Sequence, residues 1–294
     1  MEEKSWGPVS FIPGKNSGRY PYCHSLYIQA DRKIIVDPAS DRGRLLEIKN
    51  GPGVDQVWLS HFHEDHIKYL NIFDDLELFV AEADAPPLGG IEHFLEYSGM
   101  QDPSFRDSWS QTMAANFGYH PRRPAGFLEA GTVDLGGLSV DVIPTPGHTL
   151  GHTCLFFRDL DILFLGDYDL TRFGPWYGDK YVTIDQVVDS VDQLRKIPAR
   201  VWLTGHEDGV FEADPGPLWD DYLRVIDERD ALLLDLLREP RDMDQIAAAR
   251  IIYKKPREPK DFYDFGEKVL MGKHLDRFVE KGIVVKENGR FRLK

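Results

Sequence analysis

The segment His61-Phe62-His63-Glu64-Asp65-His66 says most about the fold, and it directly follows the apolar run Gln56-Val57-Trp58-Leu59-Ser60. This run is short, rich in β-branched and aromatic residues and preceded by a Gly-Pro-Gly turn, so it predicts a buried strand. Side chains two residues apart in an extended segment point the same way, so the first two histidines can hold one ion together. A bend into a helix near Asp65 turns this carboxylate and the last histidine toward a second ion. Four such side chains in six residues indicate a metal site rather than a solvated polar loop.

Three more metal-binding side chains follow predicted strands later in the chain. His148 comes after a strand at residues 138–143, within the stretch Pro-Thr-Pro-Gly-His-Thr-Leu-Gly-His. Asp167 follows an apolar run at residues 162–165, and His206 follows a similar run at residues 201–203. Strands of a rigid sheet often present reactive groups on the loops at their ends. These side chains therefore supply the further ligands that a two-metal site needs.

The ordered set of motifs resembles that of the metallo-β-lactamase superfamily. The matching segments are His-x-His-x-Asp-His at residues 61–66, Gly-His-Thr at 147–149, Gly-Asp at 166–167 and Gly-His at 205–206. The resemblance implies an α/β fold, a four-layered αββα sandwich. It also implies that His61, His63 and His148 hold one metal ion, that Asp65, His66 and His206 hold another, and that Asp167 bridges the two. His152 matches a frequent family position that is not a ligand, and we expect it to orient a ligand by a hydrogen bond.

Differences between subfamilies narrow the chemistry. The diiron oxygen-reducing flavoproteins of this fold typically have Glu at the position of His63. The best-known antibiotic-hydrolysing members lack a counterpart of either His66 or Asp167, and both are present here. The ligand set is similar to that of glyoxalase II, the lactonases and the tRNA-processing ribonucleases, and also to that of the mononuclear iron persulfide dioxygenases. The ligands alone do not separate these classes.

Composition predicts a globular protein of about two domains, because 294 residues exceed the roughly 100 to 200 of a typical domain. No apolar run approaches the roughly 20 residues that cross a bilayer, and the first residues lack the pattern of a secretory signal. We therefore expect a cytoplasmic protein without a membrane partner. Cys23 and Cys154 are the two cysteines, and we expect both to be small core residues. The formal charge of −14 disfavours binding to anionic surfaces and phosphate polymers.

Apolar periodicity predicts the organisation of the chain. A hairpin is expected from residues 25–28 and 34–36, and residues 71–130 are expected to form either a substrate wall or packed helices. Residues 168–178 form a second candidate wall, with a core role for their aromatic side chains as the alternative. A helix is expected at residues 187–197, where apolar residues recur at helical spacing.

The C-terminal part of the chain differs in pattern and charge. Residues 218–237, 243–252 and 265–281 read as helices, and a hairpin follows around Asn288-Gly289. Residues 241–294 hold 14 Lys and Arg against 9 Asp and Glu, although the whole chain is acidic. We predict a catalytic domain at residues 1–217 and a helical, winged-helix-like domain at residues 218–294. The second domain is expected to serve packing or dimerisation, with nucleic-acid binding as the alternative.

The mechanistic hypothesis is hydrolysis by a metal-bridging hydroxide, with Asp65 as the residue that accepts a proton. Two divalent ions are expected, with zinc as the default and iron or manganese compatible with the same ligands. The favoured substrate is a small ester, thioester or lactone, because the acidic surface repels polyanions. An RNA phosphodiesterase, a persulfide dioxygenase with one iron, and a non-enzymatic metal-sensing nucleic-acid-binding protein are the alternatives. A homo-oligomer is compatible with the sequence.

Overall fold

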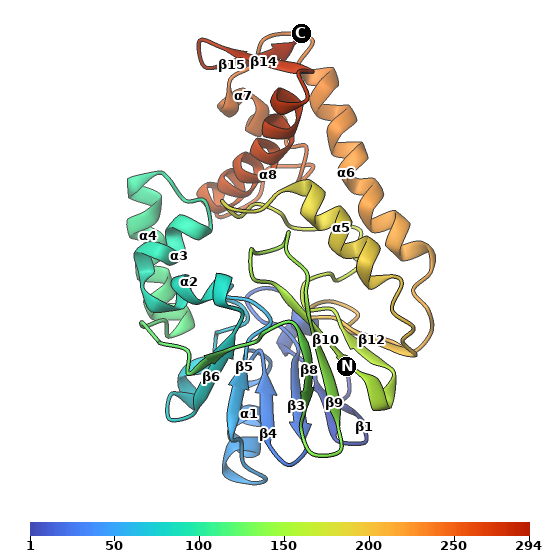
Figure 1. The fold of residues 1–294 in the computed structure, drawn as a ribbon. Coiled ribbons are helices and arrows are strands. Elements are labelled where there is room, and N and C mark those ends of the chain that lie inside the picture. Colours follow the sequence, from blue (N-terminus) through green and yellow to red (C-terminus); the bar gives the residue numbers. More distant parts are fainter.

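Two β-sheets lie face to face in the computed structural model, which describes residues 1–294, and helices cover the outer face of each sheet (Figure 1). This arrangement is the four-layered αββα sandwich that the sequence predicts. The seven-stranded sheet consists, in spatial order, of β1 (Lys4–Trp6), β2 (Val9–Ile12), β3 (Ser25–Gln29), β4 (Lys33–Val36), β5 (Gln56–Trp58), β6 (Glu77–Val80) and β7 (Gly126–Phe127). The six-stranded sheet consists of β13 (Val210–Phe211), β12 (Val201–Leu203), β11 (Ile162–Phe164), β10 (Thr153–Phe157), β9 (Ser139–Pro144) and β8 (Gly131–Asp134).

Side chains of each central strand are buried on both faces of its sheet. Neighbouring residues of a strand point to opposite faces. In β4, Ile34 and Val36 pack between the two sheets, whereas Ile35 packs beneath the helices. The side chains of β12 alternate in the same way, and Trp202 is the one that faces the helices. Because both faces are buried, these strands read as continuous apolar runs rather than as alternating ones.

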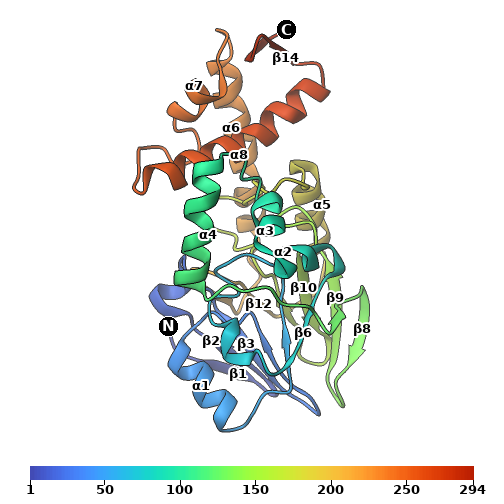
Figure 2. The same ribbon diagram turned by 90° about the vertical axis from the view of Figure 1, so that its left-hand side faces the viewer.

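The helices divide between the two outer faces, as Figures 1 and 2 show from two sides. Over the seven-stranded sheet, one apolar cluster includes side chains of α1 (Arg42–Asn50), α2 (Ala85–Gly89), α3 (Ile91–Tyr97) and α4 (Pro103–Phe117). Over the six-stranded sheet, another cluster includes α5 (Ile184–Leu194) and α6 (Pro217–Leu236). Short 3-10 helices lie at Lys15–Gly18, Leu70–Phe73, Glu82–Asp84 and Arg158–Leu160.

Most elements lie where the sequence predicts them. The expected hairpin is formed by β3 and β4, which pair antiparallel, and the four segments that precede metal-binding residues form β5, β9, β11 and β12. The expected helix near Asp65 is absent, because the chain passes there through turns into the 3-10 helix Leu70–Phe73. Helix α5 begins at Ile184, before the expected start, because Thr183 and Gln186 form a capping box.

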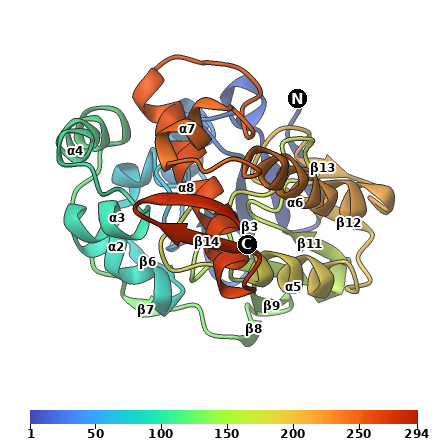
Figure 3. The ribbon, with the colours of Figure 1, turned by 90° about the horizontal axis from the view of Figure 1, so that it is seen from above.

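The C-terminal elements are α7 (Met243–Ala248), α8 (Lys260–Glu280), β14 (Val284–Glu287) and β15 (Arg290–Leu293). Helices followed by a hairpin agree with the predicted order, although α7 ends earlier and α8 begins earlier than expected. Figure 3 shows these elements above the sandwich, and their apolar side chains share one cluster with α5 and the six-stranded sheet. Winged-helix character and the division after residue 217 stay predictions. None of the helices combines the length and apolar character needed to cross a lipid bilayer.

Candidate metal centre

The seven side chains proposed as ligands come together beyond the ends of β5, β9, β11 and β12. These strands hold the loops at one edge of the sandwich, which is how residues far apart in the sequence meet. The potential ligand atoms form groups in which all atoms lie within 4.8 Å of one another. One group contains His61, His63, His148 and Asp167, and another contains Asp65, His66 and His206.

The first group has the spacing expected around a single ion. Nε2 of His148 lies 3.2 Å from Nε2 of His61 and 2.9 Å from Nδ1 of His63. Two nitrogens bonded to one tetrahedral zinc ion, at about 2.0 to 2.1 Å each, lie roughly 3.3 Å apart. Oδ2 of Asp167 completes the group at 3.2 Å from Nε2 of His148. Three imidazoles and one carboxylate therefore converge on one point.

The second group lies next to the first and shares Asp167 with it. Nε2 of His66 is 3.2 Å from Nε2 of His206, and Oδ2 of Asp65 is 3.6 Å from the same His206 atom. The two oxygens of Asp167 lie 2.8 Å from Nε2 of His66 and 3.3 Å from Nε2 of His206. Oδ1 of Asp167 is buried without a hydrogen-bond partner, which fits an oxygen that binds a cation. The carboxylate stands between the two groups.

Asp37 determines which nitrogen two of the histidines present to the centre. Ser60 donates its hydroxyl proton to Oδ2 of Asp37 at 2.6 Å, so its oxygen accepts from the Nδ1–H of His61 at 2.9 Å. The same Asp37 oxygen accepts from the Nδ1–H of His66 at 2.9 Å. Nε2 of each ring therefore points toward the centre. This is the pattern of a metal-binding histidine held by an outer carboxylate or hydroxyl.

Outer hydrogen bonds also orient His63 and His206. Both oxygens of Asp179 lie 3.1 Å from Nε2 of His63, which leaves Nδ1 toward the centre. Nδ1 of His206 donates to the carbonyl oxygen of Gly18, which leaves Nε2 free. Inner nitrogens of four rings thus face one another across short distances, an arrangement that is favourable when a cation or protons lie between them. The residues present fit divalent metal ions.

The pKa values show the electrostatic character of the centre. Burial, assisted by the nearby His66, lowers the pKa of His61 well below its usual range, so this ring is neutral as a ligand must be. Burial also disfavours protonation of His63, but the Asp179 carboxylate outweighs it and raises the pKa of His63 to about 9. Burial opposes ionisation of Asp167, yet the surrounding histidines, His66 first, lower its pKa well below the usual range. The carboxylate is therefore charged in the middle of the site.

His152 supports the site without facing it as a ligand. Its Nε2 accepts from the backbone N–H of Asp167 at 3.1 Å, and its Nδ1–H donates to the Thr145 hydroxyl at 2.8 Å. Both ring nitrogens are thus occupied, and the ring fixes the position of Asp167, as expected from the sequence. Gly166 makes this approach possible, because it has φ +54° and a Cβ there would lie 2.5 Å from Nε2 of His152.

Sequence reasoning missed two carboxylates of the centre. Asp179 binds His63 although the two residues are 116 positions apart, so no local spacing connects them. Asp169 accepts from the backbone N–H of His206 at 3.0 Å, and burial raises its pKa to about 7. The sequence did contain a signal for Asp169. It follows Asp167 by two residues, and side chains two residues apart in an extended segment point in the same direction.

Residues 168–178, the second candidate wall, contribute side chains both to the apolar core and to the surroundings of the metal centre. Tyr177 is fully buried in the core, whereas Trp176 is half-buried and donates from Nε1 to Asp179 at 3.3 Å. Arg172 is exposed. Both cysteines, Cys23 and Cys154, are buried and unpaired, as expected of core residues.

Curated relatives of the chain include thioester hydrolases. A hydroxyacylglutathione hydrolase from Synechococcus sp. (strain JA-2-3B'a(2-13)) is 42% identical over 172 residues, which cover 57% of this chain and 56% of that protein. An acyl-coenzyme A thioesterase from Gallus gallus is 33% identical over 145 residues, which cover 46% of this chain and 50% of that protein. The chain thus spans about half the length of these relatives.

Solved structures resemble the whole chain, including its C-terminal elements. A metallo-beta-lactamase family protein from Thermus thermophilus has a TM-score of 0.72 at 20% identity, covering 98% of this chain and 99% of the other. A beta-lactamase domain protein from Burkholderia ambifaria has a TM-score of 0.71 at 16% identity, covering 100% and 94%. At such identities the likeness concerns the fold. Residues 20–232 match the profile of the metallo-beta-lactamase superfamily, and with most of its length matched the chain belongs to this superfamily.

Proposed function

We propose that the protein is a metal-dependent hydrolase that cleaves a small thioester. The observation that carries the proposal is the position of Asp167, whose carboxylate lies between two groups of imidazoles and carboxylates at 2.8 to 3.3 Å from their nitrogens. A carboxylate within reach of both groups suits a two-ion site, in which one side chain can serve both ions. The names of the curated relatives, hydroxyacylglutathione hydrolase and acyl-coenzyme A thioesterase, support the thioester class.

Two divalent ions, with zinc as the first choice, suit the donor set of imidazole nitrogens and carboxylate oxygens. In the proposal His61, His63 and His148 would hold one ion, Asp65, His66 and His206 would hold the other, and Asp167 would be a ligand shared by both. When bound, divalent ions lower the pKa of water toward about 7 and polarise a carbonyl group. Iron and manganese are compatible with the same ligands.

The chain's own residues position the reacting groups and move protons. Asp65 is buried, with its Oδ2 on the side of His206, and in the proposal it accepts the proton that water releases during attack on the acyl carbonyl. Asp37 and Asp179 hold His66 and His63 in the orientation that turns one nitrogen of each ring toward the centre. The rings and carboxylates are already fixed, so they need little rearrangement when charge develops on the substrate. Such preorganisation is usually the largest single contribution to catalysis.

A small substrate agrees better with the charge of the protein than a polyanion does. The formal net charge of −14 makes RNA an unfavourable partner over most of the surface. Ionic strength distinguishes the two classes. Turnover of a neutral thioester should change little between about 50 and 200 mM salt, whereas RNA binding through several phosphates weakens by orders of magnitude over the same range.

The first testable prediction concerns Asp167. Purified protein loaded with zinc, manganese or iron is assayed with thioesters of glutathione, coenzyme A and neutral thiols, and bound metal is quantified. We expect turnover that chelation abolishes, and we expect Asp167→Asn to lower kcat/KM by a factor of about 100 or more and to reduce metal content.

Asp227→Asn is the matched control, because Asp227 is an exposed carboxylate on α6. This variant should retain both turnover and metal. Wild-type protein that binds no transition metal, or an Asp167→Asn variant that keeps full metal content and turnover, contradicts the proposed function.

A further inference from the structure

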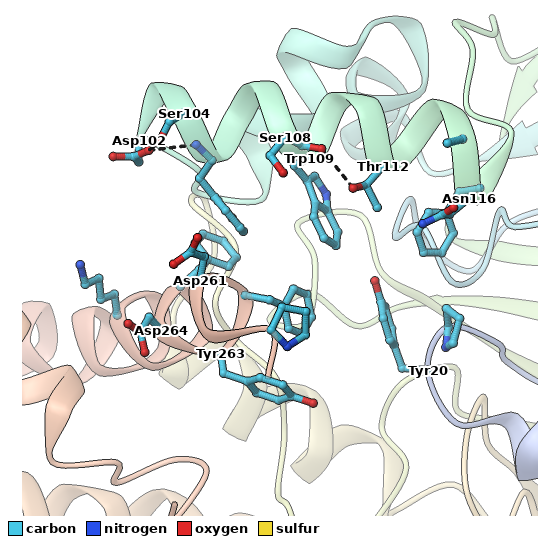
Figure 4. A pocket seen from close by; sticks show the side chains of 18 of the residues that line it. Tyr20, Asp102, Ser104, Ser108, Trp109, Thr112, Asn116, Asp261, Tyr263 and Asp264 are labelled. Atoms are coloured by element: carbon cyan, nitrogen blue, oxygen red, sulfur yellow. Dashed lines mark hydrogen bonds between the residues drawn. The ribbon is translucent and has the colours of Figure 1, made fainter. Parts of the chain in front are cut away.

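A large cleft lies between helix α4 and the first half of helix α8, with Tyr20 on its third side (Figure 4). Its volume is about 1020 Å³, which is at the upper end of the roughly 300 to 1,000 Å³ of small-molecule sites. Figure 4 shows Trp109 reaching from α4, and Tyr20 from the opposite side, into the space between the helices. The cleft is formed by segments that are far apart in the sequence.

Aromatic rings form most of the apolar wall of this cleft. The rings of Trp109 and Phe262 are nearly parallel, with centroids 5.5 Å apart, and Phe105 faces Phe265 at 5.2 Å. Tyr20 lies 5.7 Å from Phe262 and is 44% exposed. Such rings offer large contact area with few rotatable bonds, so they bind apolar groups at a low entropic cost.

Two of the charged side chains of the lining, Asp264 and Lys268, are paired with other residues of the protein. Asp264 contacts both Arg250 and Lys260, and Lys268 pairs with Asp244 at 2.6 Å. The groups left for a ligand are therefore mainly aromatic faces and small polar side chains. In total the lining has three carboxylates and two amines, namely Asp102, Asp261, Asp264, Lys68 and Lys268.

At Tyr20 the cleft adjoins the loop that carries His63 and Asp65. The Tyr20 hydroxyl donates to Oε1 of Glu64 at 3.1 Å, and Glu64 stands between His63 and Asp65 in the sequence. Lys68, another lining residue, follows His66 by two positions. A substrate whose carbonyl lies at the centre would have to pass Tyr20 to place one of its two ends in the cleft.

We propose that this cleft binds the acyl chain of the substrate, and that the chain is a medium-length apolar or aryl group. The inference rests on the proposed thioesterase function. Common thiol carriers such as glutathione and coenzyme A bear several carboxylate or phosphate charges, and the lining offers them few cations, because it has no arginine and one of its two lysines pairs with Asp244. An uncharged acyl chain meets no such penalty and buries its surface against Trp109, Phe105 and Phe262.

The test is a series of N-acetylcysteamine thioesters with acetyl, butanoyl, hexanoyl and octanoyl groups, whose neutral thiol keeps the leaving group constant. Each buried methylene is expected to raise kcat/KM about threefold to fourfold, so that octanoyl exceeds acetyl by more than about 100-fold. Phe262→Ala removes one wall, and Ser108→Phe fills the cleft from an exposed position on α4. Both variants should lower the octanoyl-to-acetyl ratio by a factor of about 10 or more.

Phe127→Ala is the matched control, because Phe127 is 45% exposed on β7 and does not line the cleft. Its octanoyl-to-acetyl ratio should equal that of the wild type. A wild-type ratio close to one, or an unchanged ratio in Ser108→Phe together with Phe262→Ala, overturns the inference.

A binding measurement separates this inference from the proposed function. The probe is a ketone in which a methylene replaces the sulfur of octanoyl N-acetylcysteamine, and calorimetry gives its affinity without turnover. Binding that is about tenfold or more tighter to the wild type than to Ser108→Phe supports the cleft even when no thioester is hydrolysed. Equal affinities overturn the inference even when acetyl thioester is turned over.

Discussion

Asp37 is the residue on which the early histidine loop depends most. It is fully buried, has φ +50°, and its two oxygens accept from the backbone N–H of Ser60, the hydroxyl of Ser60 and the ring of His66. Aspartate is one of the few residues besides glycine that tolerates this left-handed conformation. One carboxylate thereby sets the path of the chain after β5 and the orientation of two proposed ligand rings, those of His61 and His66.

We predict that Asp37→Asn weakens metal binding by a factor of about 10 to 100. The amide has one oxygen in place of two and cannot accept all three hydrogen bonds, so the His66 ring loses its fixed orientation. Competition with a metal-binding dye measures the affinity. Asp55→Asn, a change at a carboxylate that accepts from the backbone of Lys33 away from the centre, should leave the affinity unchanged. Equal affinities of Asp37→Asn and the wild type refute the role given to Asp37.

Helix α5 positions the loop that carries His148. The helix packs onto this loop so closely that a Cβ at Gly147 would lie 2.6 Å from the backbone nitrogen of Val187, and Ser190 donates to the carbonyl of Pro146 at 2.7 Å. Gly147 has φ +130°, a conformation that other residues rarely adopt. The contact between the buried face of this amphipathic helix and a glycine loop thus places a proposed ligand.

We predict that Gly147→Ala lowers metal affinity as well as stability, because the loop must move away from α5 and takes His148 with it. Gly137→Ala is the matched control, since Gly137 also has a positive φ, +89°, but has open space around its Cβ position. The control should lose about 1 to 2 kcal/mol in the free energy of unfolding through backbone strain and keep its metal affinity. Urea denaturation and metal titration of both variants provide the comparison, and equal metal affinities contradict the prediction.

In the molecule as a whole, the C-terminal elements are joined to the sandwich by a shared core. Leu270, Met271 and Leu275 of α8 belong to the same apolar cluster as Val187 and Val191 of α5. A buried polar contact accompanies the cluster, since Nε2 of His274 lies 2.8 Å from the hydroxyl of Tyr177. The two parts that we predict as separate domains therefore bury apolar surface against each other.

We predict that residues 1–217 alone do not form a stable monomer, because removal of α6 to β15 exposes the cluster over the six-stranded sheet. Size-exclusion chromatography and thermal unfolding of this fragment test the expectation. The whole chain is the reference, and co-expression of residues 218–294 should restore solubility. A fragment 1–217 that is monomeric and unfolds cooperatively identifies the C-terminal part as an accessory domain instead.

Local signals in the sequence predicted the strands and the metal-binding side chains at their ends, whereas the fold and the assignment of ligands to two ions followed from the resemblance to the superfamily. Uninterrupted apolar runs such as Val201 to Leu203 predict buried strands. A residue shortly after such a run, such as His206, is then expected at the end of that strand. The prediction of a helix near Asp65 was wrong. The loop is held by Asp37, which directly follows β4, rather than by helical hydrogen bonds.

The packing of the folded chain established which residues support the ligands and where a substrate can bind. Asp179 and His63 are separated by 116 positions, and Trp109 meets Phe262 across an even longer stretch of chain. Such pairs leave no periodicity or spacing in the sequence, because they form where two packed elements happen to face each other. A strand or a helix is encoded by neighbouring residues, whereas a hydrogen bond or a cleft between elements depends on how the whole molecule packs.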